Sequence, residues 1–212
     1  MVGRLNLSGL LTGLILCLGL SASDPSIPAL ASNANGLDFS KGAGMIHFVK
    51  PGNYFSCDLP SQWGAWIDER EEKRIKVYGV FLTGPKSING SPVTISVRFF
   101  SQANTIFKNE EDYIQRNAFP ASDIPPLKGE RFGPIQDISL AGRQAKIFER
   151  ETFDYYPPHS LDTKEIPVKE RIVVIPGRED GFYVLFFKAP TLIFAQYAPV
   201  FEKVIHSFKP GP

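Results

Sequence analysis

Near the C-terminus, the pattern of hydrophobic positions changes from that of a strand to that of a helix. Residues 181–188 (GFYVLFFK) are mostly β-branched or aromatic, which is typical of a buried strand. After a short break, apolar residues recur at helical spacing over residues 193–208. Thr191 is expected to cap this helix, and Pro199 to kink it or to mark the start of its better-formed half. The C-terminal segment therefore predicts a strand followed by a long amphipathic helix that lies on a sheet.

Apolar patterns upstream supply the other strands of that sheet. Residues 93–99 alternate between apolar and polar side chains, as expected of a strand with one packed face. Asn89-Gly90 is a strong turn signal immediately before it. Further strands are predicted at residues 46–49, 54–59, 74–82, 135–140, 144–153 and 168–175, and residues 63–68 are expected to be extended.

A second helix and two polar loops complete the prediction. Asn109 precedes three acidic residues, so it is expected to cap a short helix that ends before Pro120. Residues 69–73 (EREEK) are expected to form a charged loop, and residues 154–165 an aromatic and proline-rich loop. Because short turns join most strands, we predict an α+β fold in which helices cover an antiparallel sheet.

The N-terminal residues 1–31 have the pattern of a signal peptide. Arg4 gives a short positive region, residues 5–20 are apolar, and small residues follow. Cleavage after Ala31 fits the small-x-small rule better, and cleavage after Ser23 lies closer to the apolar run. A retained membrane anchor is the alternative, but the apolar run is shorter than the roughly 20 residues that span a bilayer.

The rest of the chain is predicted to hold one folded domain. Residues 32–45 are small and polar and predict a flexible spacer, whereas residues 46–210 carry the strand and helix patterns. Export to the periplasm or the extracellular space is expected, or to a lumen in a photosynthetic organism. No membrane span is expected once the signal peptide is removed.

Composition narrows the possible partners. Lys plus Arg (23) and Asp plus Glu (22) nearly balance, so no basic field for nucleic acid is present. Cys17 lies inside the apolar run and would leave with the signal peptide, so Cys57 would have no internal disulfide partner. Cys57 is expected to be a small buried strand residue rather than a nucleophile.

Three short segments resemble one known family. They are residues 58–63 (DLPSQW), residues 140–145 (LAGRQA) and the closing segment 197–208, which ends on Ser-Phe. Together they resemble the PsbP-like family, whose members include an extrinsic photosystem subunit and exported bacterial proteins such as DcrB. Leu59 stands where the family has a tyrosine. The resemblance covers about residues 46–209 and implies an α/β/α sandwich with a non-catalytic binding or assembly role.

No catalytic residue, metal site or cofactor is assigned from the sequence. It contains no Gly-x-Ser-x-Gly, His-Glu-x-x-His, Cys-x-x-Cys, P-loop or Gly-x-Gly-x-x-Gly motif. The three histidines His47, His159 and His206 are far apart in the sequence. Basic residues interleave with the acidic run 68–72, which indicates a solvated segment rather than a calcium site.

The segment YYPPH is the best candidate for a partner-binding site. Tyr155, Tyr156 and His159 lie in it, and exposed tyrosines give a large contact area at low entropic cost. The alternative is that the tyrosines fold back over the edge of the sheet. Trp63 and Trp66 are expected in the core.

These observations favour an exported, non-catalytic protein that binds an unidentified envelope or secreted protein or assists its assembly. The alternative is a small-ligand-binding protein or a hydrolase with a pocket between sheet and helices. A membrane-tethered structural protein is a third interpretation, which depends on the fate of the leader. An enzyme is expected to bring two or more of His47, Asp58, His159 and the acidic residues into one cleft. A binding protein is expected to expose Tyr155 and Tyr156 on a shallow surface.

Overall fold

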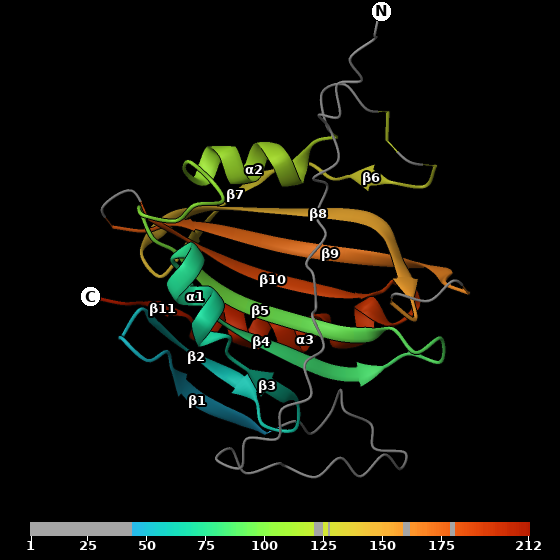
Figure 1. The fold of residues 1–212 in the computed structure, drawn as a ribbon, viewed down its shortest axis with the longest axis horizontal. Helices are drawn as coiled ribbons and strands as arrows, with labels where there is room; N and C mark the ends of the chain where they lie inside the picture. Colours follow the sequence, from blue (N-terminus) through green and yellow to red (C-terminus); the bar gives the residue numbers. More distant parts are fainter. Residues whose placement is uncertain (1–43, 121–124, 127, 159–161, 179–180) are drawn as a thin grey trace, which may run out of the picture. The chain divides into compact units, whose positions relative to one another are not determined.

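Two antiparallel sheets and three helices form the described part of the chain, confirming the predicted α+β class (Figure 1). The structure is a computed structural model, and it describes residues 44–120, 125–126, 128–158, 162–178 and 181–212. The predicted signal peptide and all but the last two residues of the predicted spacer lie outside these ranges. Within them, no helix is both long and apolar enough to cross a membrane.

The large sheet has the strand order β3-β4-β5-β10-β9-β8-β6, and β7 also pairs with β8. Its strands are β3 (Gly64–Trp66), β4 (Val77–Lys86), β5 (Pro92–Phe100), β6 (Arg131–Phe132), β7 (Gln136–Leu140), β8 (Arg143–Tyr156), β9 (Lys164–Pro176) and β10 (Phe182–Pro190). The small sheet has the order β1-β2-β11, with β1 (Met45–Val49), β2 (Phe55–Pro60) and β11 (Lys209–Pro210). Every strand pair in both sheets is antiparallel.

The helices lie on opposite faces of the large sheet (Figure 1). The long C-terminal helix α3 (Thr191–Ser207) packs against β10 and β9 and also contacts β2 of the small sheet. The helix α2 (Glu110–Ala118) contacts β8 and β9 from the other side, and α1 (Glu69–Ile75) contacts β4. We call these two surfaces of the large sheet the α3 face and the α2 face.

Side-chain alternation in β10 explains its continuous apolar run. Leu185 and Phe187 are fully buried in the core beneath α3, whereas Phe182 and Val184 belong to the core beneath α2. Because successive side chains of a strand point to opposite faces, a strand covered on both sides needs apolar residues at every position. The central position of β10 is therefore encoded in residues 181–188.

The charged segment 69–73 is helical, so the loop predicted there is wrong. The Asp68 carboxylate accepts a hydrogen bond from the Glu71 backbone N–H at 2.9 Å and caps α1. Acidic residues occupy the first turn and Lys73 and Arg74 the last turn, which suits the helix dipole. By contrast, Asn109 caps α2 as predicted, since its side chain accepts from the Asp112 N–H at 2.9 Å.

Three local predictions near the strand ends also need correction. The predicted loop 154–165 is shorter, because β8 continues to Tyr156 and β9 begins at Lys164. Thr191 is the first helical residue rather than the cap, and Pro190 takes the capping position without a side-chain hydrogen bond. Trp63 is buried as predicted, but Trp66 is 44% exposed because the short edge strand β3 leaves its ring at the surface.

Opposite charges face each other at three consecutive positions of the β8–β9 ladder. The pairs are Glu149–Arg171, Arg150–Glu170 and Glu151–Lys169. The middle pair lies on the α2 face and the outer two on the α3 face, since side chains alternate. A slip of one residue would place Glu149 opposite Glu170 and turn every side chain of the strand to the wrong face. The charge pattern therefore helps to fix the register of the longest ladder in the sheet.

Reversing one charge of the middle pair is expected to destabilise the fold. The Glu170 carboxylate contacts Arg150 and is buried, so Arg150→Glu places two carboxylates together away from water. We expect a loss of about 3 kcal/mol in the free energy of unfolding, measured by urea denaturation. The double variant R150E/E170R is expected to recover most of this loss. A double variant no more stable than R150E would show that the pair does not determine stability here.

Candidate functional site

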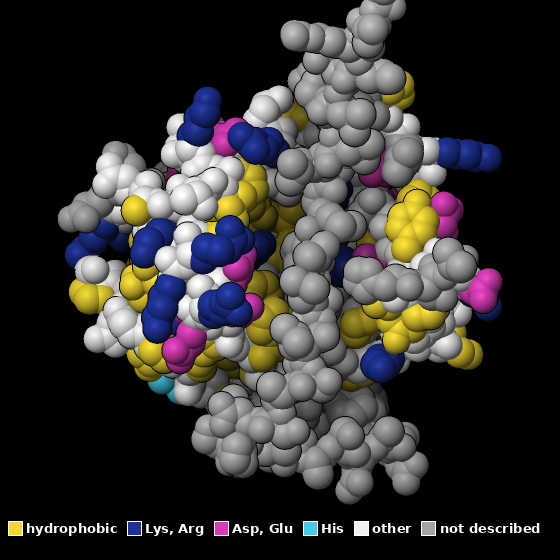
Figure 2. All heavy atoms as spheres, viewed as in Figure 1, with side chains coloured by type: hydrophobic (Ala, Val, Ile, Leu, Met, Phe, Trp, Pro, Cys, Tyr) yellow, Lys and Arg dark blue, Asp and Glu magenta, His cyan; other side chains and the backbone are white. Residues whose placement is uncertain are grey.

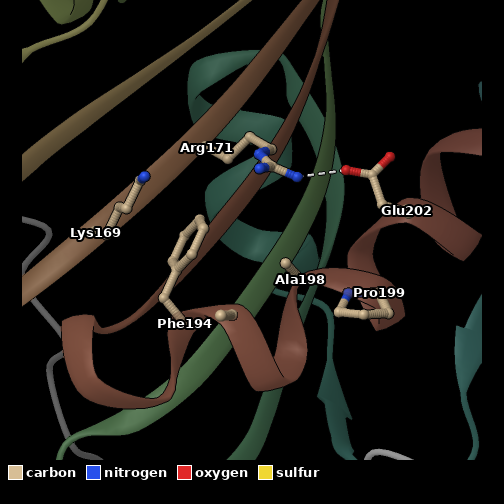
Figure 3. Close-up of a pocket in the computed structure, with 7 residues that line it drawn as sticks. Lys169, Arg171, Phe194, Ala198, Pro199 and Glu202 are labelled. Atoms are coloured by element: carbon tan, nitrogen blue, oxygen red, sulfur yellow. Dashed lines mark hydrogen bonds and ion pairs between the residues drawn. The ribbon is translucent and has the colours of Figure 1, made fainter.

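A groove of about 490 Å³ lies on the α3 face, between α3 and β9 (Figure 3). Its cationic side comes from β9, and its apolar side comes from one face of α3. The lining residues are Lys169, Arg171, Phe194, Ala195, Ala198, Pro199 and Glu202. The groove is open along its length, so it presents a shallow surface rather than an enclosed cavity.

The charges along the groove are paired with each other. Lys169 and Arg171 each approach the Glu149 carboxylate at 2.7 Å, and Arg171 also contacts Glu202 of α3 (Figure 3). Burial alone would raise the pKa of Glu149, but hydrogen bonds from Lys169 and Arg171 hold that pKa below its usual value. The two cations therefore face two anions, and the groove offers no net charge to a ligand.

Phe194 connects the charged and apolar sides of the groove. Its ring centroid lies 5.1 Å from Lys169 Nζ and 5.6 Å from Arg171 Cζ, within the range of cation–π contacts. The ring is buried against Phe187 of β10, at 4.8 Å between centroids. Phe194 thus anchors the first half of α3 to the sheet and supports both cations over the groove.

Pro199 leaves a backbone acceptor beside the groove. Proline has no N–H, so the carbonyl of Ala195, four residues earlier, receives no helical hydrogen bond from position 199. Ala195 and Pro199 are both exposed, and both line the groove. A ligand N–H can therefore find an acceptor among small apolar side chains.

The same face of β8 continues from the groove to Tyr155. Tyr155 shares its side of the strand with Glu149, because the two are separated by an even number of residues. Tyr155 is 51% exposed, and its hydroxyl donates to Glu165 of β9 at 3.3 Å. The negative charge of Glu165 raises the pKa of the Tyr155 hydroxyl. Leu192 is 87% exposed in the first turn of α3, which begins directly after β10 at the end of the sheet that carries Tyr155.

Tyr156 points to the opposite face of the sheet from Tyr155. Its ring packs over Gly90 in the β4–β5 turn, where an added Cβ would lie 2.5 Å from the ring. Gly90 also has a φ of +87°, which favours glycine. The third predicted residue, His159, lies outside the described residues. Strand alternation therefore separates the two tyrosines, and only Tyr155 lies on the face that carries the groove.

The other side chains that could act in catalysis or metal binding lie away from the groove. His47 and Asp58 are cross-strand partners in the small sheet, with 3.0 Å between His47 Nδ1 and the carboxylate, and both side chains are exposed. The Asp58 N–H donates to Ser207 Oγ at the C-terminal end of α3. Among the described residues, no three His, Cys, Asp or Glu side chains are grouped as metal ligands.

The groove itself was not predicted from the sequence. Its residues come from two segments more than twenty positions apart, and no local motif joins them. The available signal was the charge alternation at residues 149–151, which is complementary to that at residues 169–171. A second signal was the stripe of small residues Ala195, Ala198 and Pro199 along one side of a helix predicted to be amphipathic.

Comparison with known proteins gives distant likenesses of fold. No family model matches this chain, and no curated protein matches it. Solved structures similar to it include a protein of unknown function from Pseudomonas aeruginosa (TM-score 0.46, 15% identity, covering 79% of this chain and 98% of that one). A second is LpqN, involved in cell envelope biogenesis of Mycobacterium tuberculosis (TM-score 0.45, 17% identity, covering 74% of this chain and 83% of that one). A third is the cyanobacterial PsbP of Synechocystis sp. PCC 6803 (TM-score 0.45, 12% identity, covering 86% of this chain and 99% of that one). One of these structures is a PsbP, and the three sequence segments resemble the PsbP-like family.

Cys57 is expected to resist alkylation in the folded chain. Its side chain is fully buried in β2, and burial, with a smaller contribution from the Asp58 charge, raises the pKa of the thiol to about 12. In a Cys17→Ser variant, iodoacetamide at pH 8 is expected to label Cys57 only after unfolding. Because the folded pKa exceeds the unfolded value of about 8.5, stability is expected to fall as the pH rises above that value. Labelling of the native chain at the rate of a free thiol would contradict the burial.

Proposed function

We propose that this protein is exported and acts by binding, and that it captures a segment of an envelope or secreted protein along the groove between α3 and β9. The proposal rests on this groove and on two exposed apolar side chains, Tyr155 and Leu192, which lie at the end of the sheet where β10 passes into α3. Large exposed apolar residues beside a shallow groove are typical of protein-binding surfaces.

The groove suits a polypeptide segment better than a free ion. Its floor of Phe194, Ala195 and Ala198 offers contact to small apolar side chains. The Ala195 carbonyl offers an acceptor to a backbone N–H, and the paired charges of Arg171 and Glu202 offer partners of either sign. A segment with alternating apolar and charged side chains satisfies all three.

A hydrolase is the alternative function, and its pocket would be expected between sheet and helices. The groove occupies that place, but neither His47 nor His206 lines it. His206 instead approaches the Glu202 carbonyl through Nδ1 at 2.6 Å on its own helix. The side chains that line the groove include no serine, threonine, cysteine or histidine, which favours binding over hydrolysis.

Tyr155 and Tyr156 provide a matched test of the binding surface. In an affinity capture from the native envelope fraction, Tyr155→Ala combined with Leu192→Ser is expected to lower partner recovery at least tenfold. An aromatic residue at the centre of an interface typically contributes about 2 kcal/mol. Tyr156→Ala removes the same side chain from the opposite face, so it is expected to retain the partner while it remains folded by circular dichroism.

A photo-crosslinking side chain tests the groove directly. Position 195 lines the groove, whereas the neighbouring exposed position 196 does not. The same partner is expected to crosslink from position 195 and not from position 196. Equal crosslinking from both positions, or equal loss of capture in the two tyrosine variants, would remove the support for this proposal.

A further inference from the structure

The strand β1 lies at one edge of the small sheet, and one of its sides is unpaired within the described part of the chain (Figure 1). At its two ends, the Gly44 carbonyl accepts a backbone hydrogen bond from the β2 side at 2.8 Å, and the Lys50 N–H donates one to β2 at 2.9 Å. The backbone groups of even-numbered residues therefore point toward β2. Because this direction alternates along an antiparallel strand, the N–H and C=O groups of Met45, His47 and Val49 point outward.

Other strands at the ends of the two sheets are short or carry residues that resist pairing. β3 has three residues, β6 has two, and β11 consists of Lys209 and Pro210. Shortness, lysine, proline and β-bulges are the features that protect natural edge strands from association. In contrast, β1 has five residues without Lys, Arg, Asp, Glu or Pro, and it pairs with β2 without a register shift. Its outer edge therefore lacks these protections.

Apolar side chains of β1 reach the solvent on both faces of the small sheet. Ile46 lies on the core face, since its cross-strand partner Leu59 is buried, and Phe48 shares that face. Ile46 is nevertheless 52% exposed, because the core does not extend beyond this edge, and Val49 on the outer face is 49% exposed. Figure 2 shows hydrophobic and histidine side chains at the lower left of the described surface, beside the small sheet of Figure 1.

We infer that β1 pairs antiparallel with β1 of a second copy of this chain, about a two-fold axis through His47. Among the two-fold registers that join outward-facing residues to each other, this register pairs all five positions of the strand. Met45 then lies opposite Val49 at hydrogen-bonded positions. Ile46 lies opposite Phe48 at the other positions, where side chains approach more closely, and pairs of β-branched and aromatic residues stabilise a sheet.

The interface is isologous and joins the two small sheets into one continuous sheet. Each His47 at the axis has the Asp58 carboxylate of its own copy 3.0 Å from Nδ1, so two anions flank the two histidines. Stable interfaces bury about 1,200 Å² or more, and a pairing of five residues per copy is smaller, so the dimer is expected to dissociate on dilution. No residue of β1 lines the groove between α3 and β9, so the pairing is separate from the proposed partner binding.

Sedimentation equilibrium of the full chain tests the pairing over a range of concentrations. The native chain is expected to form a dimer whose fraction rises with concentration. His47→Pro removes an outward-facing N–H at the axis and is expected to raise the dimer dissociation constant at least tenfold. His47→Ala is the matched control, because it keeps that N–H and is expected to keep the dimer. A native chain that stays monomeric, or a dimer that His47→Pro leaves unchanged, would overturn the proposal.

A second pair of variants tests the edge without proline. Val49→Lys gives β1 the charge that protects natural edge strands, so it is also expected to raise the dissociation constant at least tenfold. Ile88→Lys makes a similar change at the tip of the β4–β5 turn, where Ile88 is 98% exposed, and is expected to leave the dimer unchanged. If His47→Pro does not fold by circular dichroism, this pair decides the outcome.

Cysteine crosslinking tests the register in a Cys17→Ser background, where Cys57 is fully buried. His47→Cys brings two thiols together at the axis, because hydrogen-bonded pairs have Cα atoms about 5.5 Å apart, within the range of a disulfide. Val49→Cys places its two thiols about 14 Å apart, since each lies two residues from the axis in opposite directions. Copper phenanthroline is expected to link two chains at position 47 and not at position 49. Equal linking at both positions, no linking at either, or linking to a different protein of an envelope fraction in place of a second copy would contradict this register.

Discussion

The register of the β8–β9 ladder is the constraint on which both surfaces of the large sheet depend. Charged residues at the centre of a sheet covered on both sides are costly unless each one has a partner. Here the sequences Glu149–Glu151 and Lys169–Arg171 supply three opposed pairs in one register. That register turns Lys169 and Arg171 toward α3 and Glu170 toward α2, so it places the groove on one face and a paired carboxylate on the other.

The two faces differ in whether their charges are satisfied. On the α3 face, Lys169 and Arg171 contact Glu149 and Glu202. These cations would therefore bind a partner by packing against it and by exchanging their present ion pairs for new ones, rather than through net charge. On the α2 face, Arg98 is fixed between aromatic rings without a carboxylate from the described residues. Paired cations favour a polypeptide that replaces existing contacts, whereas the rings beside Arg98 hold its guanidinium in place.

The sequence predicted elements wherever the signal was local. The alternation of residues 93–99, the cap at Asn109 and the change of period after residue 188 each depend on neighbours along the chain, and the structure contains all three elements. Helix α1 was missed because its charges were interpreted as a solvated loop, although Asp68 stood in the capping position. The exposure of Trp66 follows from the shortness of an edge strand, and the groove follows from strand pairing. No local sequence pattern indicates either the exposure of Trp66 or the groove.

The separation of Tyr155 from Tyr156 shows how strand geometry decides which neighbours in sequence share a site. The pair was predicted to act together while it was placed in a loop. Because β8 extends through both residues, one side chain continues the surface of the groove and the other packs over Gly90 on the opposite face. The same alternation places Arg98 and Val97 of β5 in different layers, one toward the α2 face and one in the core beneath α3. A sheet covered on both sides thus supports two chemically different surfaces.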